Sequence, residues 1–331
     1  MPEREPQPIC PKCGYDQSGA IATGEKQCPV DGTCPECGQK FAWADVFDPS
    51  RVFLPWYIEH TGKKRAAARR IPATLRNLLL PNVFWKKLSV QSPVYPKRLW
   101  AWVATGVLAL YALAAMLSIA LTAYNTFRWN QLATDAVTQG LIPSSAAAQY
   151  QTDMARWSFW SDLLLDQFFT PWMEFISGDD TASQIALILA GMILLWAVIL
   201  VVIPVTRRLA KLRMAHVHRA IALSLLMVIL VFMLTVLTGA VSNVLRYAGL
   251  TVTGSWGNAF NLTQARFVQA DLYARWVVTV LFVATLIWIQ WFWIAAILRG
   301  WQIRSFMLPV LGLIASLLAG YTVFLYLTVY S

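Results

Sequence analysis

The stretch Trp100–Thr122, WAWVATGVLALYALAAMLSIALT, determines the class of this protein because it contains no charged residue and no histidine. A helix needs about 20 mainly apolar residues to cross a hydrocarbon core of about 30 Å. Four later stretches share this property: Ile185–Val205, Ala220–Ser242, Trp276–Leu298 and Phe306–Tyr330. In hydrocarbon each backbone amide needs a partner within its own segment, so we expect five transmembrane helices.

The overall composition agrees with a membrane protein. The chain has 331 residues, of which 57% are hydrophobic and 13% are charged, whereas soluble domains carry about 25% charged residues. The expected fold is mainly α, a polytopic five-helix transmembrane bundle over residues 100–331. Residues 1–50 contain no apolar core of the kind that a secretory signal requires.

The distribution of basic residues predicts the topology. Ten of the 27 Lys and Arg lie between Lys63 and Arg98, where no acid occurs, and the segment after the first span has two Arg against seven acids. The next connection is basic again, with Arg207, Arg208, Lys211, Arg213 and Arg219. Cytoplasmic loops carry an excess of Lys and Arg. We therefore expect an inner-membrane protein with a cytoplasmic N-terminus and an outside C-terminus.

The N-terminal region carries a cysteine pattern typical of metal binding. Cys10 and Cys13 form one CxxC pair, Cys34 and Cys37 form a second, and 20 residues separate the pairs. Two thiolates three residues apart on a tight turn can hold one tetrahedral ion, so this spacing predicts a four-thiolate zinc site. The glycine after each pair can adopt a positive φ, which turns backbone amides toward the sulfurs.

The two motifs, Cys10-Pro-Lys-Cys-Gly14 and Cys34-Pro-Glu-Cys-Gly38, resemble a zinc ribbon of the CPxCG type. The resemblance covers residues 8–43, and it implies zinc on the four cysteines and a short β-hairpin between the two knuckles. Cys28 departs from the pattern and is either a spare thiol or an alternate ligand. A domain of this size needs a metal for stability, and four thiolates leave no open coordination position. We therefore expect structural zinc in a β zinc-ribbon head over residues 1–47.

Residues 48–99 are expected to form a basic amphipathic juxtamembrane segment. Leu75, Leu78 and Leu79 fall on one helical face, and Phe84, Trp85 and Leu88 repeat the pattern beside Lys86 and Lys87. This pattern predicts two short helices in the inner interface, with arginines toward lipid phosphates. A helix packed against the protein is the alternative.

Several polar features are expected to have no catalytic role. Asp162 and Asp166 lie one turn apart in the aromatic segment Ser144–Ile176, which is either interfacial or re-entrant, and we interpret them as a solvated face. His216 and His218 point roughly 200° apart on a helix, so they cannot share an ion. Together with His60 they are interpreted as interfacial residues. The stripe Gly312, Ser316, Gly320 allows close helix packing, within the chain or in a homo-oligomer.

The membrane part is similar to the Yip family in its span count and in the stretch from Leu79 to Leu88, LLPNVFWKKL, before the first span. Members of that family are implicated in membrane shaping or partner recruitment, and no catalytic residue can be transferred from them. The spans contain no ionisable residue, which disfavours ion-coupled transport. HExxH and GxSxG are absent, so we expect no enzyme.

These observations favour a membrane scaffold or adaptor whose ribbon recruits a cytoplasmic protein partner, in contact with membrane lipids. A passive or lipid-handling transporter or channel is the alternative. Nucleic acid is a poor partner, because the basic stretch adjoins a membrane span and the ribbon has three Lys against four acids.

Overall fold

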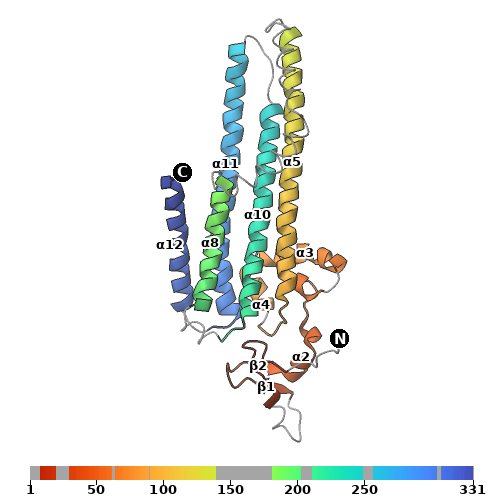
Figure 1. The fold of residues 1–331 in the computed structure, drawn as a ribbon, viewed down its shortest axis with the longest axis vertical. Helices are drawn as coiled ribbons and strands as arrows, with labels where there is room; N and C mark the ends of the chain where they lie inside the picture. Colours follow the sequence, from red (N-terminus) through yellow and green to blue (C-terminus); the bar gives the residue numbers. More distant parts are fainter. Residues whose placement is uncertain are drawn as a thin grey trace. The chain divides into compact units, whose positions relative to one another are not determined.

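The computed structural model describes residues 8–19, 30–61, 64–88, 90–138, 181–202, 211–248, 256–303 and 307–330 (Figure 1). Cys28 and Ser144–Ile176, with Asp162 and Asp166, lie outside these ranges. The contacts within the structure divide the chain into two compact units. The first comprises Met1–Ala104, Leu187–Met227 and Leu286–Tyr330; the second comprises Thr105–Ala186, Val228–Thr285 and Ser331.

Long helices dominate the described residues. They are α5 (Pro96–Thr138), α8 (Thr181–Val202), α10 (Met214–Ala248), α11 (Trp256–Ala295) and α12 (Met307–Tyr330). A short π-helix, η3 (Ala296–Gly300), follows α11. All five predicted spans are therefore helical wherever the structure describes them. The helices extend beyond the expected spans 220–242 and 276–298, because α10 continues to Ala248 and α11 already begins at Trp256.

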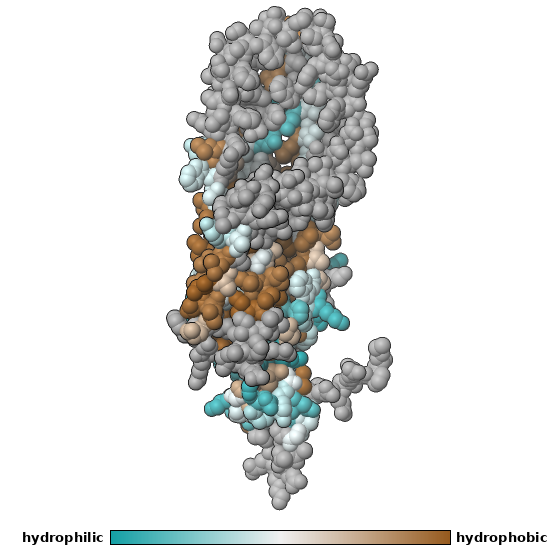
Figure 2. Space-filling model, turned by 60° about the vertical axis from the view of Figure 1, so that its left-hand side comes forward, coloured by the Kyte–Doolittle hydropathy of each residue, from teal (hydrophilic) through white to brown (hydrophobic). Residues whose placement is uncertain are grey.

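Three of these helices are long and apolar enough to cross a membrane: Pro96–Leu132, Met214–Leu245 and Leu272–Gly300. Shorter apolar stretches occur in α8, at Ile188–Leu200, and in α12, at Pro309–Leu318. Large apolar side chains such as Leu108, Ile287 and Leu318 are exposed, and Figure 2 shows hydrophobic side chains gathered over the helices. A surface of this kind suits lipid, so the protein is a membrane protein, and its described residues include three helices able to span. Five spans remain a prediction.

The N-terminal part folds as a small two-stranded unit, here called the cysteine head and defined as the described residues between 8 and 47. Strand β1 (Asp31–Thr33) pairs antiparallel with β2 (Lys40–Ala42), and α2 (Trp43–Phe47) follows directly. An isolated bridge joins Ile9 to Asp16. Strands β1 and β2 enclose the second knuckle, and the bridge encloses the first. The hairpin predicted between the two knuckles falls largely on residues 20–29, which lie outside the described ranges.

The juxtamembrane segment contains η1 (Pro49–Val52), η2 (Ile58–His60), α3 (Lys64–Leu78) and α4 (Pro81–Lys87). Pro81 occupies the first turn of α4, where its missing N–H costs nothing, and two lysines occupy the last turn, where they face the negative helix end. Four residues of this segment, 57–60, are buried and belong to the folded core.

Candidate metal centre and the buried cluster beside it

The structure brings the four predicted cysteines together. Their sulfurs all lie within 4.8 Å of one another. The Sγ atoms of Cys10 and Cys37 are 3.7 Å apart, and those of Cys13 and Cys34 are 3.6 Å apart. A tetrahedron with metal–sulfur bonds of about 2.3 Å has edges of about 3.8 Å. The sulfurs are too far apart for disulfides, and their spacing fits a single metal ion.

The two knuckles repeat one backbone design. The N–H of Gly14 donates to the Cys10 carbonyl at 2.9 Å, and the N–H of Gly38 donates to the Cys34 carbonyl at the same distance. Gly14 has φ of +80° and Gly38 has φ of +67°. A side chain strains this left-handed region, so the prediction of positive φ is confirmed and explains the two glycines.

The thiol chemistry favours a cation in this site. Burial raises the pKa of Cys13 to about 11 and that of Cys37 still further. Burial also acts to raise the pKa of Cys34, but backbone hydrogen bonds from Cys37 and Glu36 outweigh it and lower that pKa. Metals bind thiolates, so a bound divalent ion supplies the charge that keeps all four deprotonated. The donor set and its distances fit such an ion.

A small apolar core supports the sulfurs. Phe41 and Trp43 are buried with Cys10 and Cys34, and the two rings meet edge to face at 5.1 Å between centroids. Gly32 is required here because an added Cβ would lie 2.8 Å from the Phe41 ring. The core is too small to fold such a domain without help, which is the usual circumstance for a structural metal.

The cysteine head contacts the start of α10 through backbone atoms of its knuckles. The carbonyl of Lys12 accepts a hydrogen bond from the N–H of Arg213 at 3.0 Å. The Nε2 of His216 lies 2.9 Å from the Pro11 carbonyl. The Lys211 ammonium contacts the Glu36 carbonyl. The basic connection before α10, interpreted from sequence as a topology signal, is therefore also a docking segment.

Beside this contact lies a fully buried ion pair that the sequence analysis missed. The Nε of Arg219 donates to Oε2 of Glu59 at 2.8 Å, with both side chains at most 1% exposed. The other carboxylate oxygen of Glu59 accepts from the backbone N–H of Tyr95 at 2.5 Å. The guanidinium also donates to carbonyl oxygens of Ser92 and Pro93. Every charged atom therefore has a partner, as a buried pair requires.

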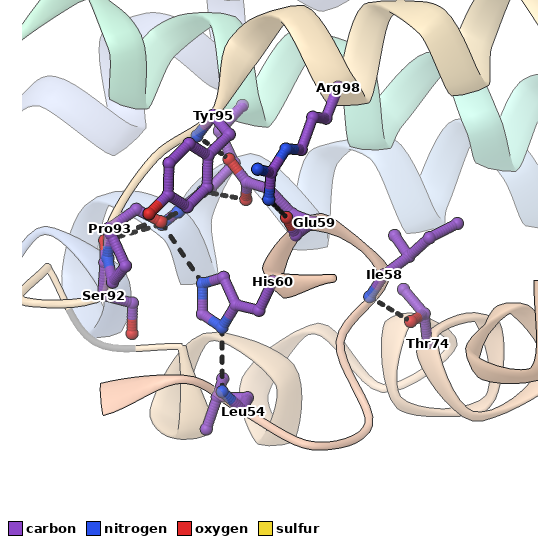
Figure 3. Close-up of polar contacts among 10 residues, drawn as sticks. Leu54, Ile58, Glu59, His60, Thr74, Ser92, Pro93, Tyr95 and Arg98 are labelled. Carbon is purple, nitrogen blue, oxygen red and sulfur yellow. Dashed lines mark hydrogen bonds and ion pairs between the residues drawn. The ribbon is translucent and has the colours of Figure 1, made fainter. Parts of the chain in front are cut away.

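His60 belongs to the same cluster (Figure 3). Its Nδ1 accepts from the Leu54 N–H at 2.8 Å, and its Nε2 lies 3.2 Å from the Pro93 carbonyl. An acceptor on one nitrogen and a donor on the other describe a neutral ring. Burial, followed by the charge of Arg219, lowers the pKa of His60 to about 4. His60 is 4% exposed, so its ring lies inside the fold and not on the surface.

The other two histidines differ from each other. His216 is buried against the cysteine head, whereas His218 is exposed with its ring 6.4 Å from that of Trp100. Within the described ranges, the four cysteines are the one group of three or more potential metal ligands. His216 thus serves hydrogen bonding to the cysteine head, and His218 packs beside Trp100.

The apolar face of α4, expected to enter lipid, packs largely against the protein. Phe84, Trp85 and Leu88 are buried, and the Trp85 ring lies 5.3 Å from that of Phe292 on α11. The Nε1 of Trp288 donates to the Leu78 carbonyl at 3.2 Å. For these three residues the alternative of a helix packed against the protein is the one observed. Their burial joins the juxtamembrane segment to the end of α11.

A polar contact also joins the helices of the first unit. The Oε1 of Gln290 on α11 accepts from Nε1 of Trp196 on α8 at 3.0 Å and from Oγ of Ser316 on α12 at 2.8 Å. A Cβ at Gly312 would lie only 2.0 Å from the Trp196 ring. Gly312 and Ser316 thus pack within the chain. The contacts of Gly320, the third residue of the stripe, are not among those that the structure describes.

Comparison with protein-family models, curated proteins and solved structures gives no match to this chain. The resemblances to zinc ribbons and to the Yip family therefore depend on the motifs quoted above. The function is therefore inferred from the geometry of the cysteine site and from its contacts.

Proposed function

We propose that this protein is an inner-membrane scaffold whose cysteine head carries structural zinc and recruits a cytoplasmic protein partner. The observation that carries the proposal is the metal centre's construction. Four sulfurs complete a tetrahedral shell, so a bound ion keeps no position for substrate, and the knuckle carbonyls are used to dock the head on α10. Zinc is the metal that this donor set prefers in proteins.

The surface of the head suits a protein partner. Tyr15 and Phe47 are both 43% exposed, and aromatic side chains are enriched at protein interfaces. A cavity of about 230 Å³ adjoins the head, and its walls include Phe41 and Val46 together with Asp45 and Arg213. A mainly apolar lining that includes two opposite charges suits a mixed polar and apolar segment of a partner.

The arrangement of the cysteines supports a cytoplasmic head. Their sulfurs are spaced for one metal ion and not for disulfides, and disulfides are the usual state of paired cysteines in oxidising compartments. The exposed arginines of α3, Arg65, Arg69 and Arg76, lie just ahead of the first span in sequence, as expected on the cytoplasmic face.

Site-specific crosslinking in cells tests the proposal. A photo-crosslinking amino acid is placed at Tyr15 or at Phe47. The control position is Leu108 on α5, which is 68% exposed and is expected to face lipid. We expect one protein adduct common to the two head positions, absent at Leu108 and lost when Cys34→Ser removes a metal ligand. A lipid or solute that co-purifies with the full chain, with no protein adduct from either head position, would instead support a passive or lipid-handling transporter.

A further inference from the structure

The turn between α3 and α4 exposes an apolar surface, here called the outer patch: Leu79, Leu80 and Val83. These side chains are 48%, 52% and 40% exposed, while their neighbours Leu78 and Phe84 are fully buried. The segment therefore has two apolar sides. One packs against the protein, and the other is left open by the described residues.

The contacts of α4 indicate how deep in the membrane the outer patch lies. The Trp85 ring lies 5.8 Å from that of Trp301, just beyond η3, and a Cβ at Gly300 would lie 2.5 Å from Trp85. The candidate span of α11 ends at Gly300. Because α4 touches the end of this span, the outer patch lies where hydrocarbon gives way to lipid headgroups.

Cations surround an open pocket of about 550 Å³ beside the patch. It is lined by Asn82, Val83, Lys86, Lys87 and Arg299. The lining has three cations and no acid, and no acid occurs in the sequence between Lys63 and Arg98. Lys87 donates to Asn77 at 2.9 Å. Lys86 and Arg299 are exposed and form no ion pair with any described residue.

We propose that this pocket binds the headgroup phosphate of an anionic phospholipid, with Lys86 and Arg299 as its main ligands. Arg presents paired donors that match a phosphate, and Lys adds a compact charge. The outer patch then meets the acyl chain of the same lipid. At the end of a span, the cations can bind the headgroup of a phospholipid and the exposed apolar side chains can contact its acyl chain. A free phosphate can bind only to the cations.

Native mass spectrometry of the delipidated full chain tests this site. The protein is titrated with phosphatidylglycerol and with phosphatidylcholine of the same acyl chains. We expect preferential binding of one phosphatidylglycerol by the wild type. One cation beside an anionic lipid surface contributes about fivefold, so K86Q/R299Q is expected to bind phosphatidylglycerol about 25-fold more weakly, with phosphatidylcholine unchanged.

Two matched variants serve as controls for the position of the charge and for folding. K40Q/R51Q removes the same charge in and beside the cysteine head and is expected to bind like the wild type. K86R/R299K keeps the charge and is expected to retain most of the binding, which separates charge from folding. Excess inorganic phosphate is expected to leave the lipid bound. Unchanged affinity in K86Q/R299Q, equal binding of the two lipids, or full displacement by inorganic phosphate would each overturn the proposal, whatever the fate of the scaffold function.

Discussion

The buried pair of Glu59 and Arg219 predicts that two changes together do less harm than either one alone. Arg219→Met leaves the Glu59 carboxylate in the core with the Tyr95 N–H on one oxygen and no partner on the other. Removing one member of a buried pair costs about 3–5 kcal/mol, because the remaining charge is uncompensated. Glu59→Leu strands the guanidinium in the same way, so each single variant is expected to lose about 4 kcal/mol.

The double variant Glu59→Leu/Arg219→Met removes both charges. An apolar replacement of a buried pair is often close to neutral. Here the carbonyl oxygens of Ser92 and Pro93 lose their donor and the Tyr95 N–H loses its acceptor, and each lost hydrogen bond costs about 1 kcal/mol. The double variant is therefore expected to lose about 3 kcal/mol, less than either single variant.

Thermal unfolding of the full chain in detergent, followed by the loss of monodisperse protein, measures the difference. A loss of 1 kcal/mol lowers the midpoint by about 2 °C in a large chain. The single variants are then expected about 8 °C below the wild type, and the double variant about 6 °C below it. The control is Arg51→Met, which breaks an exposed pair with Asp45 and is expected to cost less than about 1 kcal/mol. A double variant as unstable as the sum of the singles would refute the reasoning.

Two further predictions concern packing and pH. Gly312→Ala is expected to destabilise by about 1–3 kcal/mol because its Cβ meets the Trp196 ring at 2.0 Å, whereas Gly191→Ala, with open space around it, is expected to be neutral or stabilising; equal midpoints would contradict this. His60 has a pKa lowered to about 4, so its neutral form contributes stability that is present above pH 6.5 and lost as the pH falls toward 4. The gap in midpoint between the wild type and His60→Gln is therefore expected to shrink over that range, and a constant gap would exclude this role.

The sequence was sufficient for features that local spacing determines. Apolar runs of about 20 residues predicted the helices, and the CPxCG spacing predicted both the cysteine cluster and the positive φ of Gly14 and Gly38. The apolar runs also predicted helix at α8 and α12, where the structure has helices of 22 and 24 residues.

Features that depend on distant contacts left no local signal. Glu59 lies in a polar stretch that looks like a linker, and its partner Arg219 follows 160 positions later. The docking of the cysteine head uses backbone carbonyls, which every residue has, so no residue type marks it. The segment from Leu78 to Leu88 is apolar on two sides, and its pattern could not tell which side meets protein and which meets lipid.

X-ray absorption at the zinc edge of the purified full chain tests the central claim most directly, because it counts the ligands of the metal. A closed structural centre built from Cys10, Cys13, Cys34 and Cys37 predicts one zinc per chain with four sulfur ligands at about 2.3 Å. A shell with three or fewer sulfurs and an added oxygen or nitrogen ligand, or no stoichiometric metal at all, would contradict it.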